Sequence, residues 1–420
     1  MIKAETEDRL MVDAGSAQGR HTPQTRLTVV PGWSETGPPL GAALLAHMVG
    51  LALIGTLFPF QFDWPIHWLM TYGWDWLDFS ANVLLFLPLG FFFCMARWNA
   101  PRQSALSVLW IGALMSLGIE SAQLFLAERV ASLVDVAANA TGAWMGATLF
   151  ERLQSRLHLH GQRISRHALA LPVMGLIYLL IPLLWLNALA APEQPPRLLL
   201  ALLLGLCGAT VLGGIQRHHF SPAGVLTPPR MAAGAMLWFL GGVFPALVVQ
   251  PQEFGVAAMA VGILTWWYGS RPLSLSSTDR RFEVPVLQRA VPVYAVYLML
   301  LALIPLIDRT GTWNLSLGFP VVVTKGTSIE NLHFLEQAAA CLLLGYMVAE
   351  WRGRAVRSFR AALPRVMRWG VTIVLVLEGM EVWRADHGAS IASALVLLAA
   401  VVYGAWLYYL QLTPTDRRLT

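Results

Sequence analysis

Carboxylate and amide side chains stand at the edges of several long apolar stretches of this sequence. Asp78 and Asn82 lie one helical turn apart where the uncharged stretch 83–93 begins, and Glu120 and Gln123 lie three residues apart near the end of another apolar stretch. A carboxylate in or near hydrocarbon is costly unless it is paired or hydrated, so such residues usually face a bundle interior or a water-filled cavity. Carboxylates placed in this way can transfer protons, pair with a cationic side chain or accept hydrogen bonds from a ligand.

A third polar pair opens the stretch "SLVDVAANATGAWMG". At about 100° per residue, Asp135, Asn139, Gly142 and Gly146 fall within an arc of roughly 60° on one helical face. The first half of this stripe is polar and the second half lacks side chains. A neighbouring helix can therefore approach closely beside the glycines, as small-xxx-small packing permits, while the carboxylate and the amide face inward.

We expect these side chains to converge at one depth on one side of a membrane. The candidate ligand-binding residues are Asp78, Asn82, Glu120, Gln123, Arg129, Asp135 and Asn139, and the candidate helix-packing residues are Pro88, Gly90, Gly142 and Gly146. Arg129, in a short loop, is the expected counter-charge. Two interpretations stay open: an internal network that holds helices in register, or an outward-open pocket for the head group of a lipid-linked or cell-wall-related ligand.

The composition predicts an all-α, polytopic membrane helical bundle. The chain has 420 residues, of which 56% are hydrophobic and 13% charged, whereas about a quarter of the residues of a soluble protein are charged. About twelve segments, arranged 4+4+4, are long enough or nearly so to cross about 30 Å of hydrocarbon. They begin near Leu40, Asn82, Ser104, Leu133, Ala168, Leu198, Met231, Phe254, Val291, His333, Gly370 and Ser390.

The basic residues separate by side when these segments alternate across a membrane. Of the 29 Lys and Arg residues, 24 fall on one side. The other side receives Arg129, Arg197, Arg309, Lys325 and Arg384. Because Lys and Arg collect on the cytoplasmic side, both termini are predicted to be cytoplasmic, with residues 1–38 as a flexible cytoplasmic tail. The net charge of +5 lies in short runs between apolar segments, which argues against a nucleic-acid partner.

The order of these motifs resembles the VanZ-like family of bacterial membrane proteins, named for a protein associated with low-level teicoplanin resistance. The resemblance covers about residues 44–152 and rests on "FPF", "DFSANVLLFLPLGF", "IESAQ", Arg129 and "DVAANATGAWMG". It implies a four-helix membrane domain in which these polar positions are characteristic, in the cytoplasmic membrane of a bacterium. It implies no particular reaction, although a role in the cell envelope and in antibiotic resistance follows from the family name.

The last third of the chain resembles the first and predicts an internal repeat. "HFLEQAAACLLLGYMVAEWRGR" follows "DFSANVLLFLPLGFFFCMARWNA", and "LEGMEVWRADHGAS" follows "IESAQLFLAERVAS" after a shift of three positions. In this alignment Glu378 matches Glu120, but Ser393 stands where Asp135 was. We expect a degenerate second copy, with chance similarity between two apolar blocks as the alternative.

Four regions follow from this organisation. They are the tail 1–38, a VanZ-like four-helix membrane domain 39–156, a middle four-helix membrane segment 157–275 and the degenerate repeat 276–420. The middle segment has few charges and looks like packing helices, although its role does not follow from the sequence.

Other signals are weaker. The three cysteines lie inside apolar segments without paired spacing, so we expect no metal site, and no cofactor motif is present. The run "WRGRAVRSFRAALPRVMRW" has arginines three residues apart with interleaved aromatic residues. It fits an interfacial helix against anionic lipid, and it equally fits simple topology signalling.

The sequence thus favours an envelope protein that binds a lipid-linked glycan, phospholipid or glycopeptide head group, with membrane lipids or lipid-linked envelope precursors as partners. The alternative is a membrane-embedded enzyme in which Glu120 acts as general acid or base, Asp135 is the partner carboxylate and Arg129 steadies an anionic head group. A transporter is a weaker alternative, because transporter sites usually lie at the midplane between repeats. The oligomeric state does not follow from the sequence.

Overall fold

The computed structural model describes fifteen stretches and isolated residues of the chain, all within the compact unit Trp33–Thr420. They are residues 37–57, 62, 64, 70–71, 73, 75–97, 104–126, 130–159, 172–192, 194–220, 226–271, 283–303, 328–352, 358–381 and 390–412. The predicted tail lies outside the described residues except for Gly37 and Pro38, which begin the first helix. Arg129 also lies outside them.

The described residues form thirteen α-helices, one short π-helix and two short strands, which confirms the all-α prediction. In chain order these are α1 (Gly37–Leu57), β1 (Met70–Thr71), α2 (Trp76–Ala96), α3 (Ala105–Gln123), β2 (Ala131–Ser132), α4 (Leu133–Leu159), α6 (Pro172–Ala190), α7 (Arg197–Ile215), η2 (Gln216–Phe220), α9 (Pro228–Gly242), α10 (Phe244–Val249), α11 (Pro251–Gly269), α12 (Glu283–Leu303), α14 (Ser328–Arg352), α15 (Phe359–Glu381) and α16 (Ile391–Leu412). Each of the twelve predicted segments coincides with one of the longer helices.

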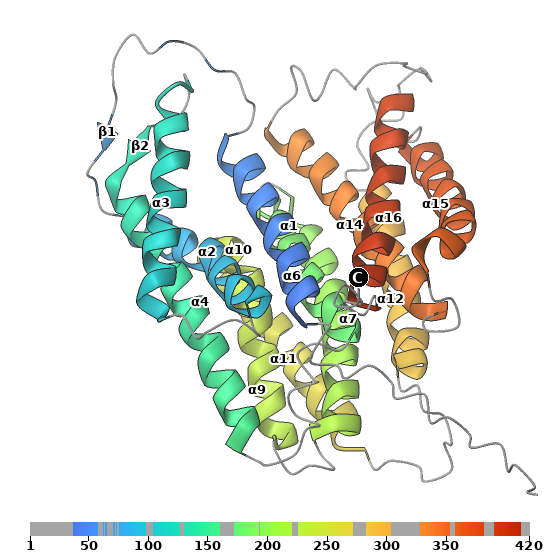
Figure 1. Cartoon of the computed structure of the whole chain (residues 1–420). Helices are drawn as coiled ribbons and strands as arrows, with labels where there is room; N and C mark the ends of the chain where they lie inside the picture. Colours follow the sequence, from blue (N-terminus) through green and yellow to red (C-terminus); the bar gives the residue numbers. More distant parts are fainter. Residues whose placement is uncertain are drawn as a thin grey trace, which may run out of the picture. The chain divides into compact units, whose positions relative to one another are not determined.

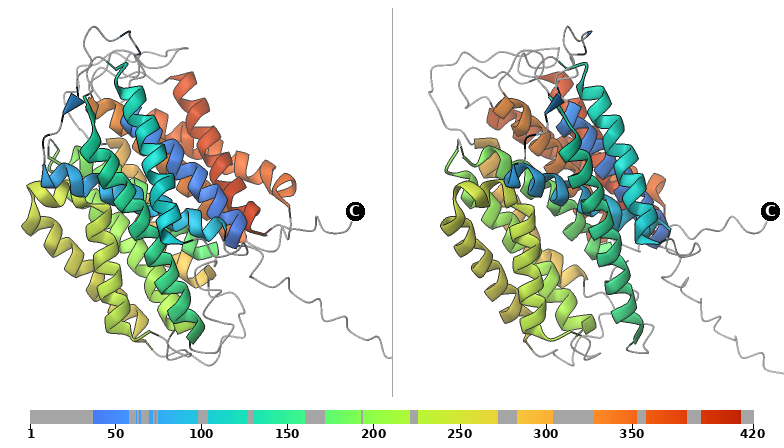
Figure 2. Two further views of the ribbon diagram at one scale, coloured as in Figure 1. Left: turned by 60° about the vertical axis from the view of Figure 1, so that its left-hand side comes forward. Right: turned by 90° about the vertical axis from the view of Figure 1, so that its left-hand side faces the viewer.

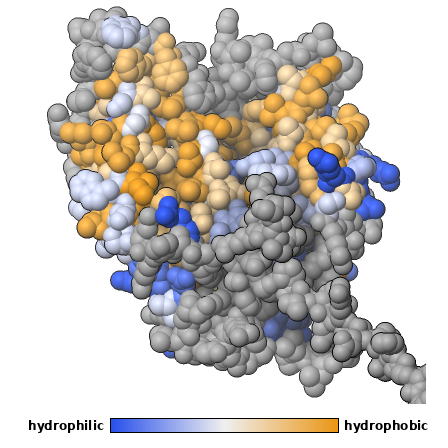
Figure 3. All heavy atoms as spheres, viewed as in Figure 1, coloured by the Kyte–Doolittle hydropathy of each residue, from blue (hydrophilic) through white to orange (hydrophobic). Residues whose placement is uncertain are grey.

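The chain is a multi-pass membrane protein. Seven stretches within the described helices are long and apolar enough to cross a membrane, and a shorter apolar stretch covers Pro38–Ile54. Large apolar side chains also face outward in helical stripes, such as Leu106, Trp110 and Leu114 on α3, and apolar residues dominate the described surface in Figure 3. Such a surface is unfavourable in water and well solvated by lipid tails. The number of membrane spans and the side on which the termini lie stay predictions.

Helices α1 to α4 form one block, drawn in blue and teal in Figure 1. Helix α4 packs along both α2 and α3, and α3 and α4 lie side by side in both views of Figure 2. The residue before α2, Asp75, caps the helix because its Oδ1 accepts a hydrogen bond of 2.9 Å from the Leu77 amide. Strands β1 and β2 pair in parallel through Met70–Ala131 and Thr71–Ser132, which ties the connection before α2 to the start of α4.

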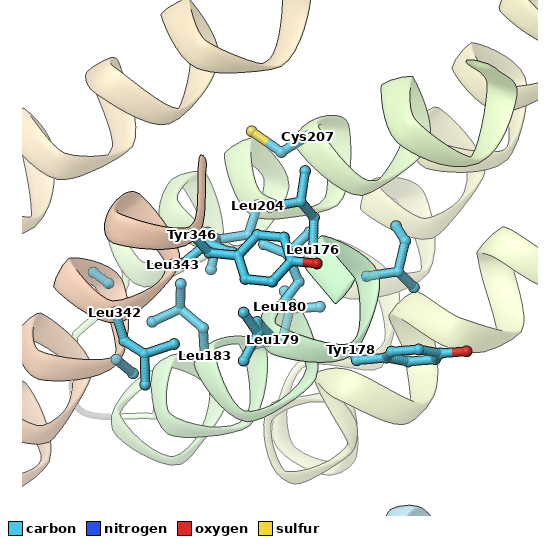
Figure 4. Close-up of a cluster of buried hydrophobic side chains, with 14 of the residues drawn as sticks. Leu176, Tyr178, Leu179, Leu180, Leu183, Leu204, Cys207, Leu342, Leu343 and Tyr346 are labelled. Atoms are coloured by element: carbon cyan, nitrogen blue, oxygen red, sulfur yellow. The ribbon is translucent and has the colours of Figure 1, made fainter. Parts of the chain in front are cut away.

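Helices α12, α14, α15 and α16 form the last block, drawn in orange and red in Figure 1. The middle helices connect the two blocks, since α6 packs against α14 and also contacts α1, while α7 packs against α12. Figure 4 shows part of this shared core, where Leu176, Leu180 and Leu183 of α6 lie near Leu343 and Tyr346 of α14. The hydroxyl of Tyr346 donates a hydrogen bond to the Pro172 carbonyl at the start of α6.

Candidate functional site

Helices α2 and α4 approach each other at backbone distance, and this contact places the polar residues of both. Gly142 lies against the Val83 carbonyl and Gly146, one turn later, lies against the Leu87 carbonyl, so the two helices run in the same direction. Gly90 in turn lies against Ala143. A Cβ atom at any of these glycines would collide with backbone. The predicted packing glycines therefore lie in the crossing itself. Pro88, the fourth predicted packing residue, is buried on α2.

The start of α4 is capped by Ser132 of β2 together with Glu120 of α3. Ser132 precedes α4, and its Oγ accepts a hydrogen bond of 3.3 Å from the Asp135 amide. In a capping box, the third helical residue would also bind the amide of the capping residue. Here that amide donates instead to Glu120 Oε2 of α3, at 2.7 Å. Glu120 is only 6% exposed. Because Glu120 accepts the amide bond, the Asp135 carboxyl group interacts instead with the Ser132 side chain and with Asp78.

The Asp135 carboxyl group meets the Asp78 carboxyl group of α2. The two lie within hydrogen-bonding reach of each other, and both act electrostatically on Glu120. Two carboxylates this close repel each other unless a proton or a cationic group lies between them. The structure therefore brings three carboxyl groups together, one each from α2, α3 and α4.

The amide candidates lie around these carboxyl groups with different partners. Asn139 is 3% exposed, and its Nδ2 donates a hydrogen bond of 2.8 Å to Ser116 Oγ, whereas its Oδ1 has no partner among the described residues. Gln123 is buried and donates from Nε2 to the Thr56 carbonyl of α1, at 3.1 Å. Gln123 thus joins α3 to α1 and contacts a different helix from Glu120.

The site is accessible on the side of α2. Asp78 is exposed and Asn82 is half-buried, while Glu120, Gln123 and Asn139 are buried. Within the described part of the chain, no group of three or more His, Cys, Asp or Glu side chains has a geometry that could hold a metal ion. The arrangement offers hydrogen-bond acceptors at the entrance and, at Asn139, a buried carbonyl oxygen that has no donor in the described part of the chain.

The structure contains a second polar cluster that the sequence analysis missed. Arg197, at the start of α7, forms an ion pair with Glu336 of α14, and both side chains are almost completely buried. Glu336 Oε1 also accepts hydrogen bonds from Asn187 of α6, at 3.2 Å, and from the Tyr297 hydroxyl of α12, at 2.9 Å. The middle segment therefore supplies a buried cation as well as packing surface.

Two signals in the sequence pointed to this ion pair. Glu336 is a carboxylate within an apolar segment, which marks a buried or functional position. Arg197 is one of the few basic residues predicted to lie on the outer side, where positive charge is uncommon. Their pairing could not be inferred, because nothing in one sequence indicates that the start of α7 lies close to Glu336 of α14.

The last block repeats several contacts of the first. The Ser390 amide donates to Glu378 Oε2, at 3.1 Å, and the Ser393 amide donates to Ser390 Oγ, at 3.3 Å. These bonds correspond to those among Glu120, Ser132 and Asp135. Gly345 lies against Val401 and Gly404 lies against Leu342, as Gly90 lies against Ala143 and Gly146 lies against Leu87.

Comparison with known proteins identifies the first block. Residues 42–154 match the VanZ/LLP1 family model. This match confirms the resemblance to VanZ-like proteins that the sequence motifs predicted. No curated protein and no solved structure matches the chain.

Proposed function

We propose that this membrane protein, whose residues 42–154 form a VanZ-like domain, binds the head group of a membrane lipid or lipid-linked glycan from the outer side of a bacterial cytoplasmic membrane. The observation that supports this most is the meeting of Asp78, Glu120 and Asp135 at an accessible edge of the helix bundle. A purely structural network would pair each charge with a cationic group, whereas among the described residues two of the carboxyl groups face each other.

The chemistry of the cluster favours a ligand rich in hydrogen-bond donors. Ionised carboxylates only accept hydrogen bonds, and the carbonyl oxygen of Asn139 is a further acceptor. Sugar hydroxyls and ammonium groups supply such donors, and a cation between Asp78 and Asp135 would relieve their repulsion. Lipid-linked glycans, amino phospholipids and glycopeptides all carry one or both of these groups.

We also propose that the last block, within residues 276–420, is a degenerate second copy of the VanZ-like domain. The repeated serine caps and glycine contacts support this, because they involve backbone positions at matching places in both blocks. The polar set differs. His333 and Gln337 stand where Asp78 and Asn82 stand in the first block, and both are only 4% exposed.

In the last block, the middle helices cover His333, which stands where the accessible Asp78 stands in the first block. The guanidinium group of Arg197 lies 3.4 Å from His333 Nδ1 and pairs with the neighbouring Glu336. A cationic side chain of the protein itself therefore lies beside the position equivalent to Asp78. We propose that ligand binding is confined to the first block for this reason.

Native mass spectrometry of the full-length protein, extracted with its membrane lipids, tests the proposed function. We expect a co-purifying lipid or lipid-linked glycan in the wild type and at least about tenfold lower occupancy in Asp78→Asn, because a charge-assisted contact contributes on the order of 1.5–3 kcal/mol. Glu378→Gln, which alters the matching serine cap of the last block, is the control and should retain the ligand. Equal occupancy in all three proteins would contradict the proposal.

Catalysis is a second candidate function, favoured by the electrostatic coupling of Glu120 to the Asp135 and Asp78 carboxyl groups. A buried carboxyl group beside other carboxylates can act as general acid or base. The variant Glu120→Gln keeps an acceptor for the Ser132 amide and removes the charge. If the variant retains the ligand but no longer forms a product that the wild type forms, the protein is an enzyme. If both proteins bind the ligand and neither forms a product, the result supports binding alone.

A further inference from the structure

A cavity of 480 Å³ lies between α12, α14 and α15 of the last block. Its lining is almost entirely apolar, with Ala295 and Leu298 of α12, Leu344 of α14, and Ile373 and Leu377 of α15 among the residues that form it. Its volume falls within the range of about 300–1,000 Å³ that is usual for small-molecule sites. The exposed side chains of Met299, Trp369 and Val376 form part of the lining, so the cavity is a groove that opens sideways on the protein surface.

One end of the groove carries a positive charge. Arg365 of α15 is the only charged residue in the lining formed by the described residues, and Trp351 and Trp369 lie with it. Trp351 is the penultimate residue of α14, so this end lies near the connection between α14 and α15. The distribution of Lys and Arg predicts that this connection is cytoplasmic, and tryptophans commonly lie at such a membrane–water boundary.

The groove is long enough to span one leaflet of a bilayer. The lining residues of α15 run from Arg365 to Met380, a rise of about 22 Å at about 1.5 Å per residue. Half of a hydrocarbon core of about 30 Å is about 15 Å. An acyl chain with its head group at Arg365 can therefore lie in the groove through the full depth of its leaflet.

We propose that this groove binds an anionic phospholipid of the cytoplasmic leaflet, with one acyl chain between the three helices and its phosphate at Arg365. The guanidinium group suits this role, because it binds phosphate oxygens through two parallel hydrogen bonds. Arg368, exposed and three residues further along α15, adds a second positive charge near the same end. At the other end, the described lining residues, which include Met299 and Met380, are apolar. This proposal is independent of the polar cluster in the first block.

Binding of defined lipids to the full-length protein tests the proposal. The probes are phosphatidylglycerol and phosphatidylcholine with identical acyl chains, added to delipidated protein and measured by native mass spectrometry. We expect phosphatidylglycerol to bind the wild type more tightly, because the quaternary ammonium of phosphatidylcholine offsets its phosphate charge. Arg365→Gln should weaken phosphatidylglycerol binding about tenfold and phosphatidylcholine binding by less. Arg230→Gln on α9, an exposed arginine distant from the groove in the helix packing, is the matched control and should bind as the wild type does.

A second variant tests the acyl-chain site. Ala295→Trp places a large side chain in the groove from an exposed position on α12, so it should fold and should reduce occupancy by both lipids. Should Arg365→Gln prove unstable, Arg365→Lys keeps the charge and should keep the preference for phosphatidylglycerol with weaker binding. Equal binding of the two lipids to the wild type, or unchanged occupancy in Ala295→Trp, would overturn the proposal.

Discussion

The first and last blocks have the same serine cap at the start of their final helix, and the surroundings of this cap differ. In the first block Glu120 binds the Ser132 amide, and the carboxyl groups of Asp78 and Asp135 meet at an accessible edge. In the last block Glu378 binds the Ser390 amide, but Ser393 replaces the second carboxylate and Arg197 of the middle segment lies beside His333. A shared backbone arrangement thus carries an open acidic site in one block and a closed ion-pair network in the other.

This difference indicates what each cluster contributes. A buried pair such as Arg197–Glu336 contributes to stability only as a unit, because each charge alone would be buried without a partner. The acidic edge of the first block has no such internal compensation among the described residues. Clusters of unfavourable polar groups of this kind are more common at functional sites than in structural cores.

The largest effect that we predict concerns the closed network. Glu336→Leu leaves the Arg197 guanidinium buried without its partner and should reduce the free energy of unfolding by about 3–5 kcal/mol. The measurement is equilibrium unfolding of the purified protein in mixed detergent. The matched change in the first block is Asp78→Asn, which should alter stability by less than about 0.5 kcal/mol, because Asp78 is exposed.

The double variant Arg197→Met with Glu336→Leu distinguishes an ion-pair effect from a packing defect. Replacing both charged partners by apolar groups of similar volume is often close to neutral, so the double variant should recover most of the lost stability. A double variant as unstable as Glu336→Leu alone would show that the effect comes from packing, and the contrast between the two blocks would lose its basis.

A smaller effect should be shared by both blocks. Gly146→Ala and Gly404→Ala each place a Cβ atom against the backbone of the neighbouring helix, at Leu87 and Leu342 respectively. Overpacking of this kind should cost about 1–3 kcal/mol at each position. Gly118→Ala is the control, because no atom lies within 4 Å of its Cβ position. A loss of stability in Gly146→Ala without a similar loss in Gly404→Ala would argue against a repeated scaffold.

The sequence could predict the parts of the fold that depend on local patterns of residues. The glycine stripe with Gly142 and Gly146 indicated close helix contact, and these glycines lie in the crossing of α2 and α4. The twelve apolar segments could be located because helices in lipid need long apolar stretches. The VanZ-like motifs could be recognised because their order spans four such segments.

The rest depended on which helices are neighbours. Gln123 and Glu120 share a helical face in the sequence, yet Gln123 contacts Thr56 of α1 and Glu120 contacts Ser132. Strands β1 and β2 have two residues each, too few for an alternating pattern. Arg197 gave the appearance of a flanking charge, because its burial depends on the position of the start of α7 beside Glu336 of α14. Because the apolar surfaces of the helices resemble one another, the sequence carries little information about which helices pack together.

The smallest predicted effect on stability separates the two interpretations of the acidic cluster. Asp135→Asn removes one of two adjacent carboxylates, so relief of repulsion should leave the free energy of unfolding unchanged or raise it by up to about 0.5 kcal/mol. The same variant should lose the co-purifying ligand, because the site then has one charge fewer.

At the matching position of the last block, Ser393→Ala removes a buried hydroxyl without a partner among the described residues, and it should change neither stability nor ligand binding. Residues selected for binding commonly cost stability. A loss of more than about 1 kcal/mol in Asp135→Asn with the ligand retained would instead assign the carboxylates to a structural network.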